Sequence, residues 1–99
     1  RQALRGLVLM MDIRHPLKEF DLQMIKWANN AKLSVHILLT KSDKLKRGAA
    51  NSSLLLVMNE LQKKELLASV QLFSSLNHEG KQEAIDQLNQ WFYPDDIAS

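Results

Sequence analysis

The residues best suited to chemistry in this chain are four polar residues that directly follow an apolar run, Thr40-Lys41-Ser42-Asp43. A carboxylate only accepts hydrogen bonds, and it accepts two in parallel when a partner presents two adjacent N–H groups. Guanine presents such a pair, its ring N1–H and its exocyclic amino group, whereas adenine has an acceptor at the matching ring position. Asp43 is therefore predicted to select guanine, with the methylene stem of Lys41 lying along the flat base.

A second polar segment, Phe73-Ser74-Ser75, follows the next apolar run along the chain. A small residue at such a strand end lets backbone N–H groups approach a base oxygen, and in guanine this oxygen is an acceptor. Lys-x-Asp alone is a weak signal, but its position between an apolar run and a helical pattern strengthens it. The predicted guanine-binding residues are Thr40, Lys41, Ser42, Asp43, Phe73, Ser74 and Ser75.

These segments require a scaffold that brings them together. Apolar runs at 7–11, 35–39 and 66–73 are typical of strands covered on both faces. Helical spacing predicts an amphipathic helix over about 16–31, a helix capped within 51–53, and a third carrying Ile85, Leu88 and Phe92. The apolar face expected for the first of these helices consists of Leu17, Phe20, Met24, Trp27 and Ala28. The order β-α-β-α-β-α predicts a three-layer α/β/α fold with a parallel sheet, whose ligands bind at the carboxyl ends of the strands.

Composition limits the other possibilities. The 99 residues are enough for one small domain, which we place at 1–93 with a tail at 94–99. A net charge of +2 does not by itself indicate nucleic-acid binding, and the lack of cysteine excludes disulfides and thiolate metal sites. No apolar run reaches the ~20 residues of a membrane span, and no secretory signal is recognisable, so we expect an intracellular, cytoplasmic protein.

Catalytic and metal-binding patterns are also missing from the sequence. The three histidines, His15, His36 and His78, are isolated from one another, and we expect His36 to be a hydrogen-bonded core residue. No serine has an evident base, and the three glycines do not form a phosphate-binding loop. We therefore predict neither a catalytic residue nor a metal ligand within these 99 residues.

The order strand-TKSD-helix-strand-FSS-helix resembles the second half of a GTP-binding (G) domain of the TRAFAC class, which has a P-loop GTPase-like fold. More narrowly, MDIRHP, DLQMIKWA, LLTKSDKL and FSSL together resemble the bacterial EngB (YihA/YsxC) family, over roughly residues 1–93. The resemblance implies binding of GTP or GDP with Mg²⁺, GTPase activity of the full-length protein, and a role in large ribosomal subunit assembly and normal septation during cell division.

Two positions depart from the general G-domain pattern. Thr40 stands where asparagine is usual, although threonine is usual within the narrower family, and Leu76 replaces a lysine. The resemblance implies that the phosphate loop and the Mg²⁺ ligands precede Arg1, so that this chain alone is not expected to hydrolyse GTP. An exposed edge of the first strand would then invite pairing or exchange with another chain.

The sequence also permits two other functional interpretations. A receiver-like signalling domain would use Asp12 and Thr40 at strand ends, but it needs a lysine after the last strand, and Phe73 to Leu76 supplies none. A non-catalytic α/β interaction domain would contain Lys-x-Asp by chance. In the G-domain interpretation, Arg14 and the basic residues from Lys44 to Arg47 are candidates for contact with ribosomal RNA or protein.

Overall fold

The fold was obtained as a computed structural model, which describes residues 5–92. Its elements alternate as predicted, and the tail predicted at 94–99 lies outside the described residues. In chain order they are β1 (Gly6–Asp12), α1 (Glu19–Asn30), β2 (Ser34–Thr40), a 3₁₀ turn (Ser42–Lys44), α2 (Arg47–Lys63), β3 (Ser69–Leu72) and α3 (Lys81–Phe92). Within the described range, none of the helices has the length and apolar character that crossing a membrane requires.

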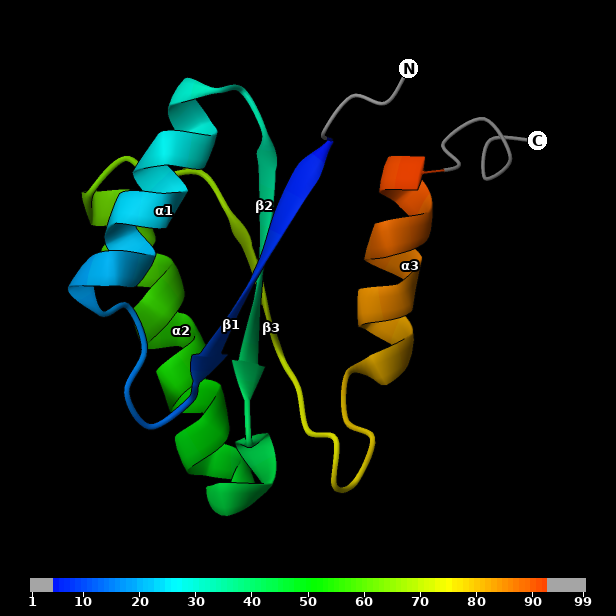
Figure 1. The fold of residues 1–99 in the computed structure, drawn as a ribbon. Helices are drawn as coiled ribbons and strands as arrows, with labels where there is room; N and C mark the ends of the chain where they lie inside the picture. The colour runs from blue at the N-terminus through cyan, green and yellow to red at the C-terminus, as the bar shows by residue number, and fades with distance from the viewer. Residues whose placement is uncertain (1–4, 93–99) are drawn as a thin grey trace.

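The three strands form a parallel sheet in the order β1-β2-β3. Helices α1 and α2 lie on one face of this sheet and α3 lies on the other, which gives three layers (Figure 1). The register pairs Asp12 with Thr40, so β1 and β2 end at the same level. The predicted parallel α/β/α architecture is confirmed, and it is consistent with the expected partial P-loop GTPase-like domain.

The apolar core lies between the sheet and the α1–α2 layer, where the inward side chains of β2 meet one stripe from each helix. The fully buried members are Ile37 and Leu39 of β2, Ile25 and Ala28 of α1, and Val57 of α2. The expected burial of Phe20 and Trp27 is wrong, because their side chains are 67% and 52% exposed. Helix α1 carries two apolar stripes, and only the stripe through Ile25 and Ala28 can face the sheet.

Element boundaries differ from the predicted ones at three places, each for a local reason. Helix α1 begins at Glu19 rather than near 16, because Leu17 has a left-handed backbone with φ of 56°. Helix α2 begins before the cap predicted at 51–53, because the Lys46 carbonyl already accepts the Ala50 N–H at 2.8 Å. Strand β3 begins only at Ser69, rather than near 66.

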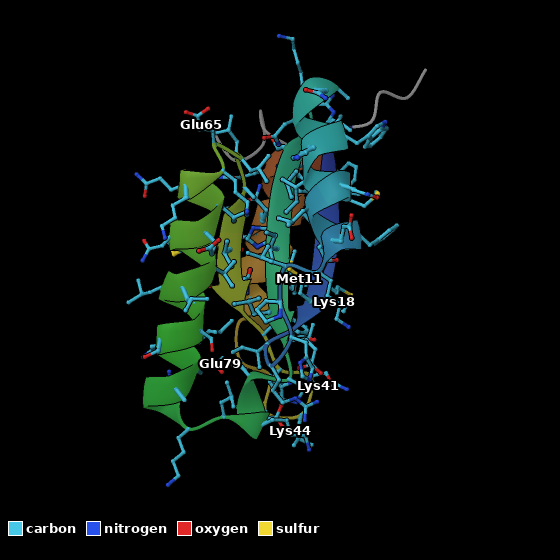
Figure 2. All side chains as sticks on the ribbon, turned by 90° about the vertical axis from the view of Figure 1, so that its left-hand side faces the viewer. Met11, Lys18, Lys41, Lys44, Glu65 and Glu79 are labelled. Atoms are coloured by element: carbon cyan, nitrogen blue, oxygen red, sulfur yellow. The ribbon has the colours of Figure 1, made fainter. Side chains whose placement is uncertain are left out.

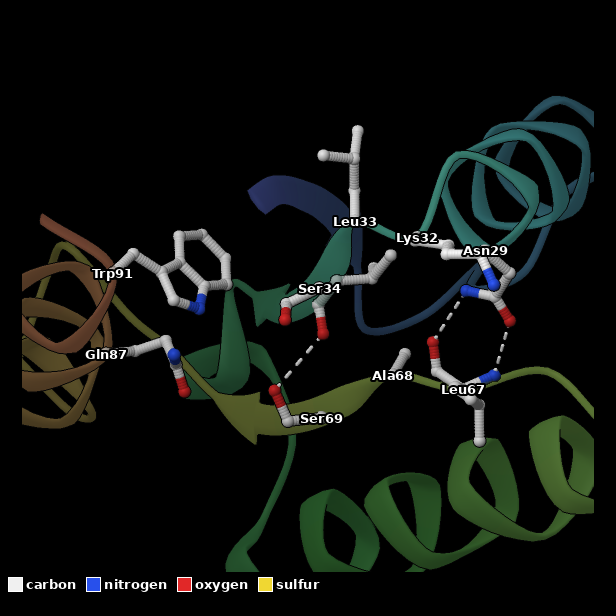
Figure 3. A pocket seen from close by; sticks show the side chains of 10 residues that line it. Asn29, Lys32, Leu33, Ser34, Leu67, Ala68, Ser69, Gln87 and Trp91 are labelled. Carbon is white, nitrogen blue, oxygen red and sulfur yellow. Dashed lines mark hydrogen bonds between the residues drawn. The ribbon is translucent and has the colours of Figure 1, made fainter. Parts of the chain in front are cut away.

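The start of β3 is shortened by a side chain of α1. The Asn29 amide donates to the Leu67 carbonyl at 3.0 Å and accepts the Leu67 N–H at 2.8 Å, so Leu67 bonds to a helix instead of to β2 (Figure 3). A cavity of about 560 Å³ opens beside this pair at the amino end of the sheet. This end is opposite the predicted guanine-binding segments.

The face of the sheet under α3 has a polar centre. His36 is buried, as predicted, with its Nδ1 2.6 Å from the Ser69 hydroxyl and its Nε2 2.6 Å from Gln71 Oε1. The Gln71 amide nitrogen donates to the Gly80 carbonyl at 2.7 Å, so its oxygen faces the imidazole as an acceptor for Nε2. This network ties the sheet to the loop that precedes α3.

Candidate functional site

The carboxyl end of the sheet brings together residues from all three strand-to-helix connections. Lys41 and Lys44 follow β2, and Glu79 reaches the same end from the loop after β3 (Figure 2). Glu65 lies at the other end of the molecule in the same view. The two segments singled out in the sequence are therefore neighbours at the carboxyl end of the sheet, where parallel α/β sheets bind ligands.

Asp43 and Ser74 join these two segments directly. The Ser74 hydroxyl is fully buried and donates to Asp43 Oδ1 at 2.6 Å. This hydrogen bond, with smaller contributions from Lys44 and Arg14, holds the pKa of the partly buried Asp43 carboxyl below its ordinary value. Asp43 is therefore ionised at neutral pH, and a carboxylate with about four acceptor positions keeps room for two further N–H donors.

The conformation of Ser74 is itself fixed by the backbone. Its oxygen accepts the N–H groups of Leu76 and Asn77 at 3.2 and 3.3 Å while its proton points to Asp43. Its own N–H donates to the Glu79 carbonyl at 3.0 Å. Ser74 thus acts as an oriented donor, and its own N–H is not available for a ligand.

Thr40 and Lys41 border the site on the side of β1. The Thr40 hydroxyl donates to the Met11 carbonyl at 3.2 Å, which ties the end of β2 to β1. Lys41 has a left-handed backbone with φ of 60°, and its ammonium lies 3.7 Å from Asp12 Oδ2. The Lys41 side chain is exposed at the carboxyl end of the sheet, two residues before Asp43.

Asp12 organises the positive charge beside the site. Its two oxygens accept Arg14 Nε at 3.0 Å and Arg14 Nη2 at 2.8 Å, and Oδ1 also accepts the Arg14 N–H at 2.9 Å. These hydrogen bonds hold the pKa of Asp12 well below its ordinary value. The sequence placed Asp12 at a strand end but did not predict its pairing with Lys41, which follows from the β1–β2 register.

Ser42 and Phe73 support the site from behind. Ser42 is buried, donates its N–H to the Phe73 carbonyl at 3.1 Å, and donates its hydroxyl to Glu79 Oε1 at 2.6 Å. The Phe73 N–H in turn donates to the Leu39 carbonyl at 2.9 Å. These two residues therefore hold the loops together, and their polar groups are directed into the protein.

Ser75 is the exposed member of the second segment. In residues 5–92 its backbone N–H has no acceptor, whereas the N–H groups of Ser74 and Leu76 are both used. A hollow of about 250 Å³ adjoins Asp43 on the side of α2, and Ser75 is not part of its lining, which consists of Ser42, Asp43, Leu45, Arg47, Ala50, Asn77 and Glu79. The arrangement offers a base one carboxylate acceptor from Asp43 and one backbone donor from Ser75.

Glu79 is the site residue that sequence reasoning missed. It lies five positions after Ser74, and its contact with Ser42 depends on the shape of the loop rather than on any pattern. That loop turns through left-handed conformations at His78 and Gly80, where a Cβ on Gly80 would collide with the Leu72 carbonyl. No sequence signal for this contact is apparent. Within residues 5–92, no group of three His, Asp or Glu side chains is placed so that it could hold a metal ion.

Comparison with known proteins places this geometry in a family. No family model matches the chain. It is 61% identical over 83 residues to the probable GTP-binding protein EngB of Acinetobacter baylyi, covering 84% of this chain and 35% of that protein. The corresponding protein of Acinetobacter baumannii is 59% identical over 83 residues, 84% of this chain and 39% of the relative.

A relative from a different genus shows the same similarity. The probable GTP-binding protein EngB of Nitrosococcus oceani is 52% identical over 91 residues, which cover 92% of this chain and 46% of that protein. The chain thus spans less than half the length of the curated relatives it matches. The predicted resemblance is confirmed, and the chain belongs to the EngB family of GTP-binding proteins.

Proposed function

We propose that the carboxyl end of the sheet binds the guanine base of GTP and GDP. The observation that carries this proposal is the ionised Asp43 carboxylate, oriented by Ser74 and open to two parallel N–H donors. Guanine supplies these donors, and its carbonyl oxygen would accept the Ser75 N–H. Adenine would place a lone pair against Asp43 and its amino group against a donor, so it is rejected.

In this arrangement Lys41 supports the plane of the base with its stem, while Asp12 restrains its ammonium. Thr40, Ser42 and Phe73 act indirectly, because their hydrogen bonds fix the loops that carry Asp43 and Ser75. The described residues therefore bind and orient the base. Phosphate binding and Mg²⁺ coordination, which GTP hydrolysis requires, would be supplied by other parts of the whole protein.

Nucleotide competition on the full-length protein tests this function. A fluorescent GDP analogue bound to the protein should be displaced by unlabelled GDP, and ADP should require at least about 1,000-fold higher concentration. The Asp43→Ala protein should retain little of this preference, with affinity for GDP lowered by about 100-fold or more, because two hydrogen bonds to a charged acceptor are lost. Displacement by ADP at concentrations similar to GDP would contradict the proposal.

The resemblance to the EngB family supports a second level of the proposal. The full-length protein would be a GTPase that assists large ribosomal subunit assembly in the cytoplasm and is needed for normal septation. In this chain, Arg14 and the basic residues Lys44, Lys46 and Arg47 are exposed at the nucleotide-binding edge. They are placed to contact ribosomal RNA or an acidic protein surface.

Charge reversal tests the ribosomal contact. Replacing Lys44, Lys46 and Arg47 by glutamate should weaken cosedimentation of the GTP-loaded protein with large subunits, and the difference from wild type should be largest at low salt and shrink as salt is raised, because screening removes the wild-type charge contacts. GDP affinity is measured in parallel, because Lys44 contributes to the charge around Asp43 and Arg47 pairs with Glu79. A loss of cosedimentation in Lys46→Glu alone, with GDP affinity unchanged, isolates the ribosomal contact. Cosedimentation equal to wild type at several salt concentrations would contradict this role.

A further inference from the structure

Glu79 connects the two halves of the candidate base-binding site. Its main-chain carbonyl accepts the Ser74 N–H at 3.0 Å, and its side-chain Oε1 accepts the Ser42 hydroxyl at 2.6 Å. Ser74 is the residue that orients Asp43, and Ser42 is the residue that precedes Asp43 in the chain. One residue of the loop before α3 thus holds Asp43 from both sides.

The bond between Glu79 and Ser42 has the features of a strong contact. Its length falls within the 2.5–2.7 Å range of hydrogen bonds between a hydroxyl and a carboxylate. Ser42 is 2% exposed, so without Glu79 its hydroxyl would lose its acceptor inside the protein. The second oxygen of Glu79 lies 3.3 Å from Arg47, whose side chain is 75% exposed, so this ion pair contributes little.

The position of Ser42 explains how the contact with Glu79 affects binding of the base by Asp43. Lys41 has a left-handed backbone, and the 3₁₀ turn that carries Asp43 starts directly after it, at Ser42. Ser42 is fixed by its N–H bond to Phe73 and by its hydroxyl bond to Glu79. If the second bond is lost, the turn keeps its backbone bonds and the contact of Asp43 with Ser74 but loses its side-chain anchor at Ser42, so the Asp43 carboxylate can tilt about the Ser74 hydroxyl.

We propose that Glu79 is a positioning residue that sets the guanine selectivity of this protein by fixing the Ser42–Asp43 turn. The proposal rests on the proposed guanine-binding function. A carboxylate accepts two parallel N–H groups only within a narrow range of angles to the base, whereas a single N–H group is still accepted after a tilt. Loss of Glu79 therefore weakens binding of a base with two N–H donors more than binding of a base with one.

Comparing GDP with inosine diphosphate isolates this effect. The base of inosine keeps the ring N1–H and the carbonyl oxygen of guanine but lacks the exocyclic amino group. The ratio of the two affinities therefore measures the amino contact alone. A variant that is partly unfolded loses affinity for both nucleotides equally, and its ratio is unchanged. The ratio therefore separates positioning of Asp43 from general destabilisation.

The experiment measures both affinities for the full-length protein by competition. We expect Glu79→Ala to lower the GDP preference by about 5- to 10-fold, and Glu79→Gln, which keeps an oxygen acceptor for Ser42, to restore most of it. Ser42→Ala should reduce the preference in the same direction and provides a second test if Glu79→Ala does not fold. Glu83→Ala is the matched control, because Glu83 is an exposed glutamate in the first turn of α3, and its ratio should equal that of wild type.

The outcomes distinguish this inference from the function on which it rests. If Asp43→Ala removes the GDP preference while Glu79→Ala and Ser42→Ala keep the wild-type ratio, the role of Glu79 is refuted and guanine binding stands. A ratio that Glu79→Gln fails to restore also refutes it. If Asp43→Ala itself keeps the wild-type ratio, guanine recognition by Asp43 is refuted.

Discussion

The Ser74 hydroxyl donates to the Asp43 carboxylate at 2.6 Å and so joins the loops that follow β2 and β3. This bond links two segments 31 positions apart in the chain. It orients the carboxylate, lowers its pKa and leaves further acceptor positions on its two oxygens. The proposed recognition of guanine depends on this pair more than on any other contact.

Removing the donor should therefore weaken nucleotide binding without abolishing it. In the Ser74→Ala protein, Asp43 keeps its charge but loses its orientation, and we expect GDP affinity to fall by about 10-fold. Ser74→Cys, which is similar in size but a weaker donor, should show a similar loss. Ser75→Ala serves as the control, because it keeps the backbone N–H that the base would use. Equal GDP affinity of Ser74→Ala and wild type would show that Asp43 does not need this partner.

The same bond predicts the pH dependence of binding. Because the pKa of Asp43 is lowered, its carboxylate stays ionised throughout the range above the ordinary aspartate value of 3.8, and Asp43 should contribute no change in GDP affinity from about pH 8 to about pH 5. In Ser74→Ala the pKa returns toward that ordinary value, so affinity should begin to fall at a higher pH than in wild type. Parallel titrations of the two proteins between about pH 7 and about pH 4 provide the comparison.

The Asp12–Arg14 pair predicts a pH dependence of folding stability. The pKa of Asp12 is lowered in the folded chain, so its contribution is complete above the ordinary value of 3.8 and is lost as the pH falls through the folded-state pKa. Asp12→Asn should therefore lower the melting temperature at pH 7, and the difference from wild type should shrink as the pH is lowered toward about 3. A difference that stays constant over this range would contradict the assignment.

The unpaired side of strand β1 predicts how the 99-residue chain associates when it is studied alone. In the described part of the chain, β1 has a hydrogen-bonded neighbour on one side only, and Met10 on this strand is 64% exposed. An unpaired apolar strand edge favours pairing with a second chain, so we expect a dimer or an exchanged assembly. Light scattering during gel filtration measures this directly, and a stable monomer would contradict it.

A charged residue on the edge provides the control for this prediction. Met10→Lys places a solvated charge on an exposed side chain, which opposes pairing between strand edges. The variant should shift the chain toward monomer without loss of helix content. An unchanged assembly in Met10→Lys would show that the contact lies elsewhere on the molecule.

The sequence was sufficient for the parts of the structure that depend on local pattern. Continuous apolar runs identified the three strands, and the segments after β2 and β3 were correctly expected at one edge of the sheet. Burial on α1 was not predictable in the same way, because Phe20 and Trp27 form an apolar stripe as regular as that of Ile25 and Ala28. The choice between the stripes is made by packing against the sheet.

Contacts made by loop residues could not be predicted from the sequence either. Glu79 meets Ser42 only because the backbone turns at His78 and Gly80 bring it back across the ends of β2 and β3. The pairing of Asp12 with Lys41 likewise needs the β1–β2 register, which no local pattern specifies. The sequence thus predicted the acceptor that reads the base, and the structure was needed to find what holds it.

The most direct test of guanine recognition is the nucleotide preference of the Asp43→Asn full-length protein. An amide at this position replaces one acceptor by a donor, which matches the added oxygen of xanthine instead of the amino group of guanine. In this variant, binding of GDP should fall by about 100-fold or more, and binding of xanthosine diphosphate should become tighter than binding of GDP. An Asp43→Asn protein that still prefers GDP over xanthosine diphosphate would contradict the assignment of Asp43.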